Sequence, residues 1–216
     1  MTELYLLGRS SSHFTRIAKI FAHELGVRYD FRVVHEIGST RVRDFGDNPA
    51  LRVPSLRSGG DIWFGSLNIC RELARRATVP HTILWPEDVR EPIAANAQEL
   101  VLETMASEVT VVMARMSGIA NDHPFMNKPY ARIRASVEWL DAELPGVFSR
   151  LPPHSLGFLE VSALCLFKHL GFREILSIDD RPSLVAFCKE FERRPSAAHT
   201  EFHFDPEPAA TDSQRP

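Results

Sequence analysis

The residues best suited to do chemistry lie in three short segments of the N-terminal third of the chain. Val53 and Pro54 form a Val-Pro step at the start of a strand-like run, and such a step is a good candidate for a cis peptide bond. A cis bond there turns neighbouring main-chain N–H and C=O groups out of the sheet. Exposed main-chain groups beside a sheet edge can pair with an extended peptide. The predicted chemistry is therefore recognition of a peptide-like ligand.

Two serines stand at the predicted starts of helices, where unpaired N–H groups and a partial positive charge favour anions. Ser12 closes the run Ser10-Ser11-Ser12 before the first predicted helix, and Ser66 opens another. We expect a carboxylate to bind at Ser66 and a thiolate to be stabilised near Ser12. Ser11 and Ser10 are alternatives for the sulfur, and helix capping alone is the simplest role for all three. Glutathione, an extended tripeptide with a thiol and carboxylates, fits these requirements.

The apolar pattern predicts the elements that position these segments. It indicates a strand, a helix and a strand over 4–7, 12–25 and 29–34, then a hairpin of the Pro54 strand with 61–64, and a helix over 66–76. This βαβ then ββα order is the thioredoxin-like arrangement, which we assign to residues 1–78. In such a sheet the first loop and the Pro54 turn lie side by side, and the Ser66 helix begins nearby.

The amino-acid composition of the chain changes after residue 78. Three prolines interspersed with charges mark 79–92 as a linker, and strand signals vanish beyond it. Helical spacing over 94–115, 129–144, 159–170 and 182–193 predicts an all-helical bundle at 93–204, so the fold class is α/β plus all-α. The end, 205–216, is rich in Pro, Ala, Asp and Gln, and we expect it to be disordered.

Composition excludes several classes of function. The formal charge of −3 leaves no basic surplus for phosphates, so no nucleic-acid partner is expected. No apolar run is long enough to span a bilayer, and the start does not read as a signal peptide. The three cysteines are odd in number and widely spaced, as expected for buried free thiols in a reducing cytoplasm. We therefore expect a cytoplasmic protein with no membrane partner.

Four motifs carry a family resemblance that extends to about His203. Ser12-His13-Phe14-Thr15, before Gly26, stands where Ser- and Cys-type glutathione transferases of bacterial type carry their active residue. Asn48 through Leu56 is similar to the Asn-Pro-x-x-x-Val-Pro-x-Leu signature of these enzymes. Gly65-Ser66 stands where these enzymes usually have Glu-Ser or Asp-Ser. Arg194-Pro195-Ser196 resembles the Arg-Pro-Ser sequence that is common in them after the penultimate helix. The chain thus resembles the cytosolic glutathione transferase family.

The resemblance implies a role for each site residue. Ser12 would donate a hydrogen bond to the glutathione sulfur and favour its ionised form, acting as a donor and not as a nucleophile. The Val53 main chain would pair with the cysteinyl portion, and Ser66 would hold the γ-glutamyl carboxylate. The other residues expected to line glutathione are Phe14, Pro54, Gly65 and, for the glycyl carboxylate, Arg52.

The resemblance also implies attack of the glutathione thiolate on a hydrophobic electrophile, by a homodimer. Met105, Met113 and Met116 are candidates for the co-substrate pocket because Met is soft and adaptable, with core packing or dimer contact as the alternative. Gly65 replaces the usual acidic partner of the γ-glutamyl ammonium, which keeps a non-catalytic binding protein open as an alternative. A glutathione-dependent thiol reductase is less favoured because positions 10–15 contain no Cys.

The histidines are not predicted to hold a metal. His199 and His203 are four residues apart, but no third ligand accompanies them. We expect His13 to be exposed, in the position where the family carries Pro, with assistance in proton transfer as the alternative. Glutathione is therefore the only small molecule that the sequence implies besides the electrophile.

Overall fold

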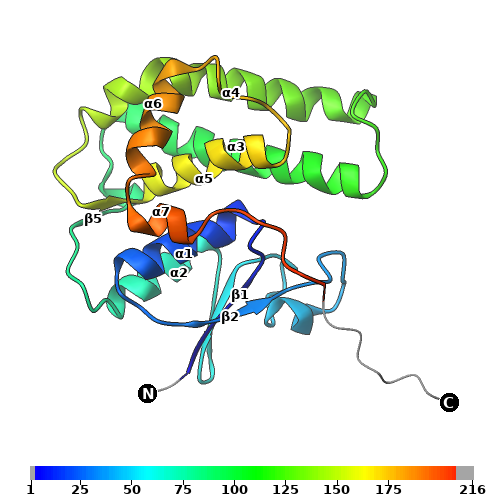
Figure 1. The fold of residues 1–216 in the computed structure, drawn as a ribbon, viewed down its shortest axis with the longest axis vertical. Helices are drawn as coiled ribbons and strands as arrows, with labels where there is room; N and C mark the ends of the chain where they lie inside the picture. Colours follow the sequence, from blue (N-terminus) through cyan, green and yellow to red (C-terminus); the bar gives the residue numbers. More distant parts are fainter. Residues whose placement is uncertain (1–2, 208–216) are drawn as a thin grey trace.

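The N-terminal part of the chain is a four-stranded sheet covered by two helices (Figure 1). The structure is a computed structural model and describes residues 3–207. Strand β1 (Leu4–Gly8) runs parallel to β2 (Asp30–Val33) and antiparallel to β3 (Ser55–Ser58), which pairs with β4 (Asp61–Phe64). Helices α1 (His13–Glu24) and α2 (Ser66–Arg75) pack against each other. The predicted thioredoxin-like arrangement is confirmed. A 3₁₀ turn, η1 (Val42–Phe45), lies between β2 and β3.

Local signals explain the first helix. The Ser12 side chain caps its start by accepting a hydrogen bond from the Thr15 N–H. Ile17 and Phe21 lie on its inner face and are fully buried. The chain leaves the helix through Gly26, whose φ of +65° is easily adopted only by glycine.

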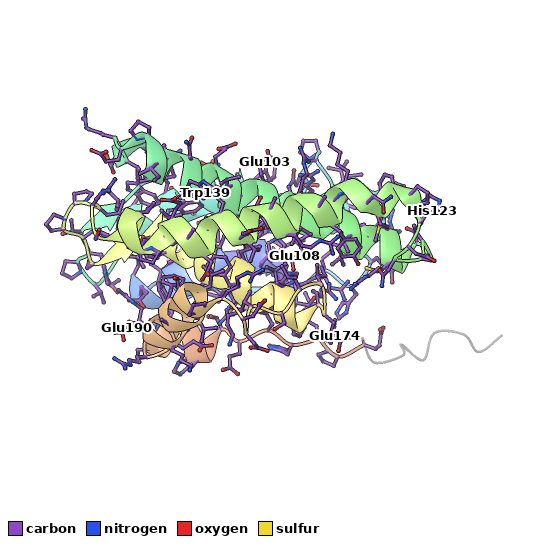
Figure 2. All side chains as sticks on the ribbon, turned by 90° about the horizontal axis from the view of Figure 1, so that it is seen from above. Glu103, Glu108, His123, Trp139, Glu174 and Glu190 are labelled. Atoms are coloured by element: carbon purple, nitrogen blue, oxygen red, sulfur yellow. The ribbon has the colours of Figure 1, made fainter. Side chains whose placement is uncertain are left out.

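A helical region follows, as predicted. Helices α3 (Pro92–Met116) and α4 (Pro124–Phe148) lie side by side along most of their length (Figures 1 and 2). Helix α5 (Phe158–Phe172) packs against both α3 and α1, which explains why it is apolar nearly all round. Helices α6 (Pro182–Phe191) and α7 (Pro195–His199) complete the region. Within residues 3–207 no helix combines the length and the apolar character needed to cross a membrane.

Two predicted boundaries differ from the structure. The helix expected over 129–144 is α4, which begins at Pro124 and continues past both Pro129 and Pro145. The linker expected at 79–92 contains a short strand β5 (Ile83–Leu84) and a 3₁₀ turn η2 (Pro86–Asp88). Strand β5 pairs in parallel with β6 (Leu156–Gly157) in the helical region. Strands of two residues have no periodicity from which a sequence could predict them.

The end of the described chain returns to the start of α1. The buried Arg16 guanidinium donates to the Ala197 carbonyl (3.1 Å), which ties α1 to α7. The main-chain N–H of Ser10 donates to Asp205 Oδ2 (2.9 Å). Asp205, the expected first residue of the disordered tail, therefore has a defined contact, and 208–216 lie outside the described residues.

Candidate functional site

The three segments singled out in the sequence meet at one end of the sheet. The register pairs Leu7 of β1 with Ser55 of β3, and Ser55 with Phe64 of β4. The end of β1 and the end of β4 therefore flank the start of β3. The loop to α1, the Pro54 turn and the start of α2 consequently share this edge.

The Val53–Pro54 peptide bond is cis, as predicted. Asn48 holds the preceding loop: its Nδ2 donates to the Arg52 carbonyl (2.8 Å), and its Oδ1 accepts from the Ala50 N–H (3.0 Å). Val53 is half-buried, and among the described residues neither its N–H nor its C=O has a hydrogen-bond partner. Its main chain is thus available to a ligand, while the Arg52 side chain extends into solvent.

The three serines before α1 have different surroundings. The Ser10 hydroxyl accepts from Lys19 Nζ (3.1 Å), and the Ser11 carbonyl faces His169 Nε2 (2.9 Å); both serines are buried. Ser12 is half-buried, and its Oγ accepts the Thr15 N–H at 3.3 Å. No described residue accepts the Ser12 hydroxyl proton, so this group can cap the helix and donate to a ligand simultaneously.

Helix α2 opens on a second available terminus. Ser66 is its first residue and is buried, and Gly65 immediately before it has φ +78° and no side-chain cap. The first N–H groups of any helix lack intrahelical partners. A β-carbon built at Gly65 would meet nothing within 4 Å, so there is open space at this corner of the site.

The remaining predicted site residues are dispersed. Phe14 is half-buried, with its ring centroid 4.5 Å from that of His13. Met105 is fully buried in the hydrophobic core, which is the position of a packing residue and not of a pocket wall. Met113 and Met116 are exposed near the end of α3. The fully buried Met105 and the exposed Met113 and Met116 therefore do not share one surface.

The expectation that His13 is exposed is wrong. Its side chain points into the junction between α1, α3 and α5, where only 1% of the residue is exposed. There it meets His169 of α5 and Glu108 of α3, which are 3% and 0% exposed. Figure 2 shows Glu108 in the interior of the helical region. The sequence holds a weak signal for this cluster, because both His169 and Glu108 interrupt otherwise buried helix faces.

The environment of this cluster shifts its acid–base equilibria. Burial, together with the charges of His169 and Arg173, holds the pKa of His13 well below its ordinary value. Burial raises the pKa of Glu108, and the neighbouring His169 and Arg173 oppose that rise. His13 is consequently neutral at neutral pH.

Comparison with known proteins assigns the N-terminal domain to a family. Residues 11–76 match the family model of the glutathione S-transferase N-terminal domain. No curated protein matches the chain by sequence. Among solved structures, a glutathione S-transferase from Methylobacillus flagellatus with glutathione bound is 18% identical, with a TM-score of 0.74 over 93% of this chain and 100% of that one.

Two further structures agree with this match. A glutathione S-transferase from Methylobacterium radiotolerans, in complex with glutathione sulfonate, is 17% identical, with a TM-score of 0.73 over 97% of this chain and 100% of the other. A family member from Pseudomonas fluorescens with bound glutathione is 20% identical, with a TM-score of 0.70 over 93% and 100%. Residues 11–76 therefore form a glutathione S-transferase N-terminal domain, and the described chain has the fold of these transferases.

Proposed function

We propose that this protein is a glutathione transferase, which conjugates the glutathione thiolate to a hydrophobic electrophile. One observation carries the proposal: the cis Val53–Pro54 turn, with a free Val53 main chain, lies at the same sheet edge as the starts of α1 and α2. An extended tripeptide can pair with the turn while its charged ends reach the helix termini. Bound glutathione in the similar structures supports this reading.

Each site residue has a proposed task. The Val53 main chain pairs with the cysteinyl part, and the start of α2 at Ser66 binds the γ-glutamyl carboxylate. The Ser12 hydroxyl donates to the sulfur. A thiol has an ordinary pKa of about 8.5, so a donor that stabilises the thiolate raises the fraction of nucleophile at neutral pH. Phe14, Pro54, Gly65 and the exposed Arg52 complete the proposed lining.

A non-catalytic glutathione-binding protein is the second candidate. Gly65 favours it, because this position carries no acidic side chain for the γ-glutamyl ammonium. A thiol reductase is disfavoured, since all three cysteines are buried and none lies at positions 10–15. Conjugation of glutathione to an electrophile distinguishes the transferase from the non-catalytic binding protein.

The test is conjugation of glutathione to a generic aryl halide by the wild type, Ser12→Ala and Ser12→Thr. A hydrogen bond to a charged group is worth about 1.5–3 kcal/mol. We therefore expect Ser12→Ala to lower kcat/KM by roughly 10- to 100-fold, and Ser12→Thr, which keeps a hydroxyl and a helix cap, to lose much less. Glutathione binding without turnover by the wild type, over a broad panel of electrophiles, would establish the binding protein instead.

We further propose that the protein acts as a homodimer in the cytoplasm. The dimer is implied by the family resemblance, and Met113 and Met116 are exposed apolar residues that a second copy could cover. Light scattering of the purified protein, coupled to size-exclusion chromatography, measures the mass in solution. A mass of one chain at micromolar concentration would exclude the dimer.

A further inference from the structure

The cluster formed by His13, Glu108 and His169 is not used by the proposed transferase chemistry. We propose that it is a binding site for a divalent transition-metal ion of the zinc class, at the junction of α1, α3 and α5. The proposal does not depend on glutathione binding or turnover. The sequence predicted no metal, because the pair His199 and His203 has no third ligand, and nothing in it indicated that three residues so far apart along the chain would meet.

Three potential ligand atoms converge in this cluster. His13 Nδ1 and His169 Nδ1 are 2.9 Å apart, and Glu108 Oε1 is 2.8 Å from His169 Nδ1. Glu108 Oε2 is 3.5 Å from His13 Nδ1. One ligand atom from each residue lies within 4.8 Å of the others. Donors at zinc–nitrogen and zinc–oxygen distances of about 2.0–2.2 Å in a tetrahedral site are spaced in a similar way.

With both imidazoles neutral, His13 Nδ1 can donate to His169 Nδ1, but the ring protons leave the Glu108 carboxylate without a donor. His169 Nε2 is 2.9 Å from the Ser11 carbonyl, which can only accept, so this nitrogen carries the proton. In the neutral ring the His169 Nδ1 then presents a lone pair to both His13 and Glu108. Both Glu108 oxygens are buried without hydrogen-bond geometry to any donor of the described residues, although Oε1 is within ion-pair distance of His169. A cation would satisfy the lone pair of His169 Nδ1 and the Glu108 carboxylate together, and His13 Nδ1 becomes a third ligand when its ring proton is on Nε2.

The bond from His169 to Ser11 is also the outer contact that metal-binding histidines characteristically make. A ligating histidine usually donates its second ring N–H to a carbonyl or carboxylate, which fixes the tautomer and the orientation of the ring. Here that carbonyl belongs to the residue before Ser12. The arrangement therefore prepares His169 Nδ1 as a ligand before any ion arrives.

The donor set selects the class of ion. Two imidazoles and one carboxylate suit Zn²⁺, Fe²⁺ and similar ions, whereas Ca²⁺ and Mg²⁺ prefer oxygen ligands. Within residues 3–207 the cluster includes no fourth His, Cys, Asp or Glu, so one position of a tetrahedral ion is left for water or another small ligand. The ring of Phe14 flanks His13, and those of Phe172 and Phe202 flank His169. This apolar wall limits exchange of the ion with solvent.

The experiment measures Zn²⁺ binding to the full chain after chelator treatment, by isothermal titration calorimetry. We expect one ion per chain and a rise in Tm on loading. Loss of an outer-shell partner alone typically costs about 10- to 100-fold in metal affinity. Glu108→Gln and His169→Gln, which each remove a ligand, should therefore weaken binding by more than about 100-fold.

His199→Gln is the matched control. His199 is exposed and its ring centroid lies 4.8 Å from that of His23, so this surface pair is the obvious place for adventitious binding. The control should bind as the wild type does. If Glu108→Gln or His169→Gln fails to fold, anomalous diffraction at the zinc edge from wild-type crystals locates the ion directly. Failure of the wild type to bind Zn²⁺ stoichiometrically, or an ion located elsewhere, would overturn the proposal.

Discussion

Gly65 stands where the family resemblance predicts an acidic residue, and its backbone explains part of this difference. Its φ of +78° is strained for any residue with a side chain, although a β-carbon would meet no neighbour within 4 Å. The acidic residue that the resemblance predicts would therefore have to bear this backbone strain. A glycine avoids the strain and leaves open space beside Ser66.

Gly65→Ala should lower the free energy of unfolding by about 1–3 kcal/mol, because the cost is that of the left-handed backbone alone. The matched control is Gly146→Ala, an exposed position inside α4 that also has nothing within 4 Å. There alanine should stabilise the protein by up to about 1 kcal/mol, since it is the better helix former. Urea unfolding measures both changes. Equal effects at the two positions would contradict the role assigned to the Gly65 backbone.

Lys19 lies beside the loop that leads into α1, and its burial leads to a pH-dependent prediction. Its Nζ contacts Ser10 Oγ and lies over the Phe31 ring at 3.5 Å. Burial lowers its pKa from 10.5 to about 8, against the raising effect of Asp205. At a pH between about 8 and 10.5, Lys19 keeps its proton in the unfolded chain but has released it in the folded protein. The free energy of unfolding should therefore rise as the pH rises through this window, because the cost of burying the ammonium disappears.

Replacement of Lys19 by Met removes this titration. The variant should be more stable than the wild type near neutral pH, and the difference should shrink as the pH approaches about 10. The difference between the two urea-unfolding curves isolates Lys19 from all other groups that titrate there. Curves that stay parallel across the whole range would show that the Lys19 ammonium carries no burial cost.

At the scale of elements, the clearest long-range contact is the cap of α6. Asp141 of α4 accepts hydrogen bonds from the N–H groups of Ser183 and Leu184, at 3.0 and 3.2 Å. The residue that precedes α6 in the chain, Arg181, makes no side-chain cap. One helix therefore satisfies the free N–H groups of another, which fixes the angle at which they pack.

Asp141→Ala should lower the free energy of unfolding by about 1 kcal/mol, as the loss of a helix cap typically does. Asp141→Asn keeps an acceptor oxygen at the same place and should retain most of that stability. Thermal unfolding of the two variants provides the comparison. Equal destabilisation by Ala and Asn would assign the effect to the charge and not to the cap.

The same elements show how far the sequence could predict this protein. The thioredoxin-like order and the helices of the second region follow from periodicity, which depends on residues near one another in the chain. The Asp141 cap, the β5–β6 pair and the burial of His13 depend on partners at least 42 residues away. The predicted ends of α4 were wrong for a similar reason. Local propensity would end the helix at Pro129 and at Pro145, but packing against α3 maintains it past both residues.

The residues of the candidate site likewise divide into those that short motifs could predict and those that only tertiary packing determines. The cis Val53–Pro54 bond and the helix starts at Ser12 and Ser66 were predicted, since motifs of a few residues determine them. Met105 as a pocket residue was a weaker prediction, because soft apolar side chains serve cores and pockets equally well. Only the packing of α3 places Met105 in the core.

At the scale of the whole molecule, α1 is the element that joins the two regions. Its first residue, His13, lies in the cluster with Glu108 of α3 and His169 of α5. Its last residue, Glu24, accepts a hydrogen bond from the Ser196 hydroxyl of α7 at 2.5 Å. Arg16 forms a third connection, to Ala197. The helix that begins at the proposed thiolate site is therefore fixed to the helical region at both ends, which keeps the start of α1 in place when a ligand binds.

The most direct test of the account is the binding of glutathione itself, measured by isothermal titration calorimetry. The wild type should bind one glutathione per chain. Ser66→Ala should weaken binding by about 10-fold or more, since it removes a hydrogen bond to a charged carboxylate. Ser183→Ala, in the first turn of α6, should bind as the wild type does. No binding by the wild type, or equal binding by Ser66→Ala, would contradict the proposed glutathione site.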